Sequence, residues 1–324
     1  MSEQISKQIY VSAIDIGTNS IHGIIASMDA KGAMNEISRD KESIRLGGSM
    51  INRIISDKAL AAATDTLKRF KKEADKHSAV IKAVATSAVR EAENRDVFVK
   101  HIRVHTGIDV QVISGEQEGL LIYKGVNYAF PIFDFSTLII DIGGGSTEII
   151  LAKKGEIIFL DSLKLGAIRT SNQFFKEFVT DEKSIQKCKN HIKQTMENSV
   201  KQIRELGFDF VVGTSGTIQA LGRIVLFSKR NTSPGFLNGI TINSMDFYKL
   251  FSKIELLDSP EQRALIPGID LSRADLITAG ELILQNFLNE LSIPKMLISS
   301  YSLREGIIID TFEKLSINNR NFKI

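Results

Sequence analysis

Apolar residues along the chain follow two spacings, one typical of strands and one typical of helices. Two apolar stretches, Tyr10 to Ala26 and Leu138 to Ala152, are each broken by a short polar loop, which predicts a strand, a tight loop and a second strand at both places. From Ser56 onward, apolar residues recur at steps of three and four, so we expect an amphipathic helix to begin there. These residues are Leu60, Ala63, Leu67, Phe70 and Ala74.

The second half of the chain repeats the order of the first. A predicted strand at residues 81–88 follows the first helix, and a predicted helix from Ser184 to Leu206 precedes a predicted strand at residues 208–216. Two successions of strands, helix, strand and helix indicate mixed sheets with helices on their faces, which is an α/β architecture. Duplication of a domain explains this repetition simply.

The length of 324 residues exceeds what one hydrophobic core usually holds, so we expect two domains. We place them at residues 1–127 and 128–303, with a last helix over residues 304–324 that packs back on the first domain. A cleft between the two domains is the expected position of a site.

Composition narrows the function classes. The chain has 43% apolar and 24% charged residues, which is typical of a folded globular protein. Its net charge of +3, from 41 basic and 38 acidic residues, gives no reason to expect binding to duplex nucleic acid.

The N-terminus is polar and no apolar run is long enough to span a bilayer, so we expect no membrane association and a cytoplasmic location. The single cysteine, Cys188, lies in a lysine-rich stretch and is expected to have no catalytic role.

The two polar loops share the pattern Asp-Ile-Gly-x-x-Ser, which starts at Asp15 and again at Asp141. Glycine leaves backbone N–H groups open to a ligand, and serine and threonine hydroxyls are further donors for phosphate oxygens. The pattern therefore predicts two phosphate-binding loops. The expected phosphate-binding residues are Gly17, Thr18, Asn19, Ser20, Gly143, Gly144, Gly145, Ser146 and Thr147.

An aspartate beside a bound anion repels it unless a cation lies between them. We therefore expect Asp15 and Asp141 to bind Mg²⁺ or its water shell, with Glu148 as a third carboxylate. For either loop alone, a structural β-turn with a solvated aspartate explains the residues as well. Two matched loops at equivalent places favour phosphate binding.

A third glycine-rich element follows a predicted strand and opens a predicted helix. Because the N-terminus of a helix attracts anions, Gly213, Thr214 and Ser215 are also expected to bind phosphate. An ordinary strand-to-helix turn, in which Thr214 or Ser215 caps the helix, explains the same residues equally well.

In this order, the three elements resemble those of the actin, Hsp70 and sugar-kinase superfamily, and most closely those of the exopolyphosphatase and guanosine pentaphosphate phosphatase family. The matching segments are AIDIGTNS, ATSAVREAEN, ISGEQEGLLIYKGV, LIIDIGGGSTEIILA, SLKLGAIRTS, VVGTSGT and YSLREG. The resemblance implies two ribonuclease H-like domains, dependence on Mg²⁺ and hydrolysis of a terminal phosphoanhydride.

The resemblance also implies roles for single residues. The catalytic glutamate of the family falls on Glu118, its arginine on Arg90, and its metal-linked acidic positions on Asp141 and Glu148. Gly119 stands where alanine is usual in the family. None of the catalytic groups is missing from this sequence.

Each of these residues also has a plainer explanation. Ser114 and Gln117 form a capping box, so a helix is expected to start there. Gln117 stands where many relatives have a second glutamate. Glu118 in the first turn could then act only by its favourable interaction with the helix dipole. Arg90 could belong to an exposed network of charges, although the resemblance favours a phosphate clamp. Arg169 is expected either to bind phosphate or to hold the second loop in place.

The predicted activity is release of terminal phosphate from inorganic polyphosphate, guanosine pentaphosphate or both. Glu118 would orient the attacking water and accept its proton. The alternatives are an ATP-dependent small-molecule kinase of the same superfamily and a non-catalytic sensor that binds polyphosphate or an alarmone. A homodimer is compatible with the sequence. Longer family members carry a further C-terminal helical domain related to HD phosphohydrolases, which leaves processive binding of long polymers open.

Overall fold

The computed structural model describes residues 8–29, 31–48, 50, 52–230 and 235–321. The chain forms two compact units, one made of residues 1–114 with 303–324 and the other of residues 115–302. Among the described residues, each unit contains one sheet, with five strands in the first and six in the second. The first seven residues, which carry most of the polar N-terminus noted above, lie outside the described residues.

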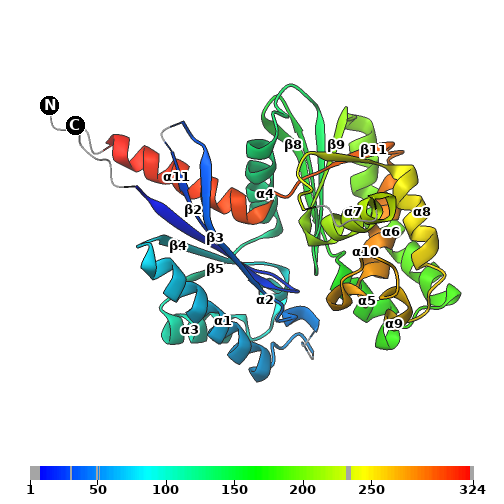
Figure 1. Cartoon of the computed structure of the whole chain (residues 1–324), viewed down its shortest axis with the longest axis horizontal. Helices are drawn as coiled ribbons and strands as arrows, with labels where there is room; N and C mark the ends of the chain where they lie inside the picture. Colours follow the sequence, from blue (N-terminus) through cyan, green and yellow to red (C-terminus); the bar gives the residue numbers. More distant parts are fainter. Residues whose placement is uncertain (1–7, 30, 49, 51, 231–234, 322–324) are drawn as a thin grey trace. The chain divides into compact units, whose positions relative to one another are not determined.

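The sheet of the first unit has the strand order β3-β2-β1-β4-β5 (Figure 1). The first three strands are antiparallel neighbours, whereas β4 runs parallel to both β1 and β5. The strands are β1 (Tyr10–Ile16), β2 (Ile21–Met28), β3 (Met34–Glu42), β4 (Val80–Ala85) and β5 (Val110–Val112). The helices are α1 (Asp57–Lys76), α2 (Ser87–Glu91), α3 (Arg95–Thr106) and α11 (Leu303–Asn321), and a 3₁₀ helix spans Leu46–Gly48.

Both faces of this sheet are covered by helices. Helix α1 begins where the sequence predicts, because the Ser56 hydroxyl caps it by accepting from the N–H of Ala59. Its apolar stripe packs with Ile14 and Ile16 of β1 in one buried cluster. Alternate residues of β1 point to the other face, and there α11 packs against β1 and β2 (Figure 1).

The second sheet repeats this arrangement and extends it, with the strand order β10-β11-β9-β6-β7-β8. Strands β6, β7, β8, β9 and β11 pair with the same directions as β1, β2, β3, β4 and β5. The strands are β6 (Thr137–Ile142), β7 (Thr147–Lys153), β8 (Glu156–Leu163), β9 (Phe210–Thr214), β10 (Ile240–Asn243) and β11 (Lys295–Ile298). The helices are α4 (Gly115–Ala129), α5 (Ala167–Phe174), α6 (Glu182–Leu206), α7 (Ser215–Arg230), α8 (Ser244–Ile254), α9 (Pro260–Arg263) and α10 (Ile277–Glu290).

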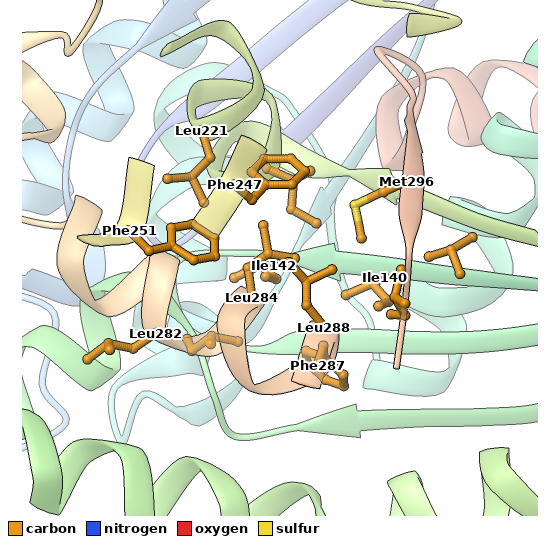
Figure 2. Close-up of a cluster of buried hydrophobic side chains, with 14 of the residues drawn as sticks. Ile140, Ile142, Leu221, Phe247, Phe251, Leu282, Leu284, Phe287, Leu288 and Met296 are labelled. Atoms are coloured by element: carbon orange, nitrogen blue, oxygen red, sulfur yellow. The ribbon is translucent and has the colours of Figure 1, made fainter. Parts of the chain in front are cut away.

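One large hydrophobic core supports the second sheet. Figure 2 shows Ile140 and Ile142 of β6 among side chains from α7, α8, α10 and β11. Helix α6 packs into the same core, where Cys188 is fully buried. Burial raises the pKa of the Cys188 thiol to about 12, which is typical of a cysteine that packs in a hydrophobic core.

The α/β class and the repeated topology are confirmed, but the border between the units differs from the expected one. Helix α4 belongs to the second unit, which starts at Gly115, whereas we expected the first domain to extend to residue 127. The reason is packing: a Cβ atom on Gly119 of α4 would lie 2.9 Å from the side chain of Leu160 in β8. Glu118 therefore belongs to the same unit as Asp141 and Glu148.

Candidate functional site

The first Asp-Ile-Gly loop is a tight hairpin that connects β1 and β2. It is closed by the Gly17 N–H, which donates to the Ser20 carbonyl at 3.1 Å. The turn around the 3₁₀ helix supports it from outside, since the N–H groups of Arg45 and Gly47 donate to the carbonyls of Asn19 and Thr18. Two carbonyls of the hairpin thus point toward the supporting turn.

The second loop, between β6 and β7, is built in the same way. The Gly143 N–H donates to the Ser146 carbonyl at 2.9 Å. The start of α5 supports this hairpin, because Ala167 and Ile168 donate their N–H groups to the carbonyls of Gly143 and Gly144. The prediction of two equivalent loops is therefore confirmed at the level of individual hydrogen bonds.

This support fixes the direction of the hairpin N–H groups. In a trans peptide, the N–H of one residue points opposite to the carbonyl of the residue before it. The N–H groups of Asn19 and Ser20 in the first hairpin therefore point away from the supporting turn. In the second hairpin, the N–H groups of Gly144 and Gly145 point away from α5, because the carbonyls before them accept from α5. The Ser146 N–H also points away, because the Gly145 carbonyl accepts from the Nε of Arg169 at 2.6 Å. Successive N–H groups on one side of a turn form an anion-binding concavity.

Some of the predicted phosphate-binding residues hold the hairpins together instead of offering donors. The N–H groups of Gly17 and Gly143 close their own hairpins. The hydroxyl of Thr147, which is fully buried, donates to the Leu165 carbonyl at 2.7 Å. The Thr18 and Ser20 side chains are also buried. Among the backbone groups of the two hairpins, the outward N–H groups are the candidate donors for a phosphate.

A row of polar side chains crosses the second sheet beside its hairpin. Strand register places Thr214 of β9 opposite Asp141 of β6, Asp141 opposite Glu148 of β7, and Glu148 opposite Ser162 of β8. Paired residues project from the same face of a sheet. The neighbours Ile140 and Ile142 project into the large core, so the polar row lies on the opposite face.

The two carboxylates of this row suit a divalent cation. Asp141 and Glu148 are 6% and 1% exposed, and directly opposed like charges destabilise a sheet unless a positive charge lies near. Within the described part of the chain, no three His, Cys, Asp or Glu side chains form a complete metal site. Magnesium needs no such site, because one or two carboxylates, waters and substrate phosphates suffice to bind it. The residues present therefore fit Mg²⁺ bound together with a phosphate.

Helix α4 covers the face that carries the polar row. A Cβ atom on Gly115 would lie 2.3 Å from the Cβ of Ser162, and Gly119 lies against Leu160, two residues before Ser162. Glu118 stands between these glycines on the same side of the helix and is 7% exposed. The helix begins at Gly115, as the sequence predicts. The structure thus brings Glu118 to the sheet face of the two carboxylates.

The third glycine-rich element supports the second hairpin. The Thr214 hydroxyl donates to the Tyr301 carbonyl at 3.0 Å, and the Ser215 hydroxyl donates to the Ile142 carbonyl at 2.7 Å. Ser215 has a positive φ of 82°, a strained conformation for a residue with a side chain. A Cβ atom on Gly213 would lie 2.2 Å from the Met296 sulfur, so close packing requires glycine there.

The two predicted arginines lie in different units. Arg90 ends the short helix α2, whose start is tied to the first hairpin strand by a hydrogen bond from the Thr86 N–H to the Ile16 carbonyl. Its Nη1 donates to the Ile113 carbonyl at 3.0 Å. Arg169 supports the second hairpin by donating to the Gly145 carbonyl. Holding this loop in place is one of the two roles that the sequence left open for Arg169, the other being phosphate binding.

The first unit has a different set of residues at the positions of the polar row. Asp15 is opposite His22, which stands where the second unit has Glu148. Helix α11 covers this face, and Arg304 donates to the Nδ1 of His22 at 3.1 Å. Glu305 is 1% exposed and accepts from Arg39 at 2.9 Å. The acidic pair of the second unit is therefore not duplicated in the first.

The helices α4 and α11 also share a sequence signal that sequence reasoning missed. Glu-Gly followed by three aliphatic residues occurs at residues 118–122 and again at 305–309. The strand positions beside the two helices correspond as well. Arg39 of β3 is opposite Ile24 of β2, as Leu160 of β8 is opposite Ile150 of β7. The repeat would have identified Glu305 as the counterpart of Glu118. Two further residues of the site, Ser162 and Ser302, carry no comparable signal.

Two ribonuclease H-like units with equivalent Asp-Ile-Gly hairpins define a protein of the actin-like two-domain class. Residues 24–315 match the model of the Ppx/GppA phosphatase family. The chain belongs to this family.

Curated relatives and solved structures agree with this assignment. The guanosine-5'-triphosphate,3'-diphosphate pyrophosphatase of Vibrio parahaemolyticus is 31% identical over 98% of this chain and 62% of its own length. The crystal structure of an exopolyphosphatase from Cytophaga hutchinsonii has a TM-score of 0.86 and 28% identity, over 94% of this chain and 98% of that chain. An Aquifex aeolicus member of the Ppx/GppA family has a TM-score of 0.78 and 26% identity, over 95% of this chain and 98% of that one. The chain thus spans less than two thirds of the length of the curated relative.

No helix among the described residues combines the length and apolar character needed to cross a membrane.

Support of the second hairpin by α5 can be tested at Gly166. A Cβ atom there would lie 2.5 Å from the backbone of Gly144, which cannot move aside without displacing the hairpin. We expect Gly166→Ala to lower the free energy of unfolding by about 1–3 kcal/mol, measured by urea denaturation. The matched control is Gly235→Ala, because no atom of the described residues lies within 4 Å of a Cβ atom at Gly235. Equal stability of the two variants would contradict the proposed support.

Proposed function

We propose that the protein is a phosphohydrolase that releases terminal phosphate from inorganic polyphosphate, guanosine pentaphosphate or both, with the help of Mg²⁺. The observation that carries this proposal is the hairpin at residues 143–146, whose N–H groups point outward beside the buried Asp141–Glu148 pair. Such a site offers donors for phosphate oxygens and ligands for a cation within a few residues of one another. The printed names of the relatives, a guanosine nucleotide pyrophosphatase and an exopolyphosphatase, support the same substrate class.

The residues of the second unit take distinct parts in this reaction. The N–H groups of Gly144, Gly145 and Ser146 hold oxygens of the terminal phosphate, and Asp141 with Glu148 holds Mg²⁺. When bound, Mg²⁺ neutralises charge on the phosphate and leaving-group oxygens. Phosphoryl transfer requires mainly such positioning and charge stabilisation, so the protein need not form a covalent intermediate.

Glu118 is the candidate for the general base because of its position: α4 places it on the sheet face that carries Asp141 and Glu148, and it is 7% exposed. Its counterpart in the first unit, Glu305, forms an ion pair with Arg39. In the second unit the position of Arg39 is taken by Leu160. We assign to Glu118 the orientation of the attacking water and acceptance of its proton.

The first unit is assigned a supporting part. The outward N–H groups of Asn19 and Ser20, together with Arg90, are donors for further phosphate oxygens of the substrate. Asp15, next to this hairpin, is assigned to the water shell of Mg²⁺.

The role of Glu118 can be tested by Glu118→Gln, which removes the base but keeps the size of the side chain. We expect kcat for phosphate release to fall by about 10²–10⁴-fold, the usual contribution of a general base. Glu116→Gln is the matched control, because Glu116 lies in the same first turn of α4 but is exposed. A Glu118→Gln variant with the turnover of this control would remove Glu118 from the role.

The comparison with Glu305 predicts the effect of an arginine at position 160. We expect Leu160→Arg to pair with Glu118 as Arg39 pairs with Glu305, and to lower kcat at least about tenfold at neutral pH. An arginine partner lowers the pKa of a carboxyl group, so the acidic limb of the pH–rate profile should move to lower pH. Leu160→Met, which keeps the volume, is the control. An unchanged pH profile in Leu160→Arg would contradict this explanation.

The substrate class is tested by measuring phosphate release from short polyphosphate, long polyphosphate and guanosine pentaphosphate, each with Mg²⁺ and with a chelator. We expect release from at least one of them, and its loss on chelation, because the two carboxylates alone repel the substrate. A product formed only with ATP and a second acceptor would indicate a kinase. Tight binding without any release would indicate a sensor.

A further inference from the structure

Two serine hydroxyls contact the two carboxylates of the polar row. Ser302 donates from Oγ to Oδ2 of Asp141 at 2.6 Å, and Ser162 donates from Oγ to Oε1 of Glu148 at 2.7 Å. Both distances are in the short range typical of a hydroxyl bonded to an ionised carboxylate. Asp141 and Ser302 are both buried, at 6% and 8% exposure, so little solvent competes for their bond.

Ser302 is held in place by its own segment of chain. The Ser299 N–H donates to the Gly213 carbonyl, and the Ser299 hydroxyl donates to the Tyr301 carbonyl at 2.7 Å. The Tyr301 carbonyl also accepts from Thr214, the residue opposite Asp141 in the sheet. The Ser302 hydroxyl therefore reaches Asp141 from a segment that is fastened to the neighbouring strand.

Ser162 is held by strand register and by α4. It is the direct partner of Glu148 across β7 and β8, and Gly115 packs on its side chain. With any larger residue at 115, a Cβ atom would fall 2.4 Å from the Ser162 hydroxyl. The contact between Ser162 and Glu148 therefore depends on the first residue of the helix that carries Glu118.

We propose that Ser162 and Ser302 are positioning residues that orient Glu148 and Asp141 for the divalent cation. This proposal rests on the proposed function, since it concerns the same carboxylates. Hydrogen bonds that fix the ligands of a metal typically change its affinity about 10–100-fold. Ser302 directly precedes Leu303, and Ser162 of β8 is contacted by Gly115; Leu303 and Gly115 are the residues at which the chain changes from one unit to the other. The cation site is thus fastened to both crossover segments.

The experiment is titration of the whole protein with Mn²⁺ in the presence of inorganic phosphate, followed by electron paramagnetic resonance, with phosphate release measured in parallel. We expect Ser302→Ala and Ser162→Ala each to weaken Mn²⁺ binding at least about tenfold and to raise the Mg²⁺ concentration for half-maximal activity. Activity of both should recover at high Mg²⁺. Ser302→Thr, which keeps a hydroxyl, should bind Mn²⁺ within about threefold of the unmodified protein, since the bond to the ligand is retained.

Ser244→Ala is the matched control for a purely structural effect. The Ser244 hydroxyl is buried in the same unit and donates to the Ile293 carbonyl, far in sequence from either carboxylate. This variant should lose stability without a change in Mn²⁺ affinity. Mn²⁺ affinity that is equal in Ser302→Ala, Ser162→Ala and Ser244→Ala would overturn the proposal.

Asp141→Asn separates this proposal from the proposed function. If Asp141→Asn abolishes Mn²⁺ binding while both serine variants bind normally, the serines have no positioning role and the cation site stands. If Asp141→Asn binds Mn²⁺ like the unmodified protein, the cation site itself is wrong, and the proposal fails together with it.

Discussion

The site depends on the direction of a few peptide groups. A phosphate is bound by N–H groups and repelled by carbonyls, and a tight hairpin exposes both unless its peptides are held one way. In each unit the turn after the third strand donates N–H groups to the hairpin carbonyls, through Arg45 and Gly47 in one and through Ala167 and Ile168 in the other. The fold thus turns these carbonyls toward the supporting turn and leaves the N–H groups on the other side, and in the second hairpin the Arg169 side chain holds the Gly145 carbonyl in the same way.

The same scaffold explains why the two units differ in chemistry. Both present a tight hairpin, and both cover the polar face of the sheet with a helix that carries a Glu-Gly pair. Only the second has two carboxylates opposed across the hairpin strands, because His22 takes the position of Glu148 in the first. The first unit instead holds Glu305 in an ion pair with Arg39.

Sequence alone predicted the elements that depend on local patterns. The strand-loop-strand repeats, the start of α1 at Ser56 and the start of α4 at Gly115 follow from apolar spacing and capping residues. The border near residue 127 was wrong, because it depends on the contact of Gly119 with Leu160, which are far apart in the chain. Strand register likewise decides that Asp141, Glu148 and Ser162 share one row, and no pattern within a single strand encodes that.

Long-range contacts also decide which hydroxyls remain for a ligand. Thr147, Thr214 and Ser215 look equally suited to phosphate in the sequence, yet each donates to a backbone carbonyl that shapes the hairpins or the crossover segment. A hydroxyl has one proton to donate, so these side chains cannot also donate to a phosphate in this arrangement. Their part is to keep the backbone rigid. Rigidity suits the proposed reaction, because donors that are already aligned need no reorganisation when charge develops on phosphate oxygens.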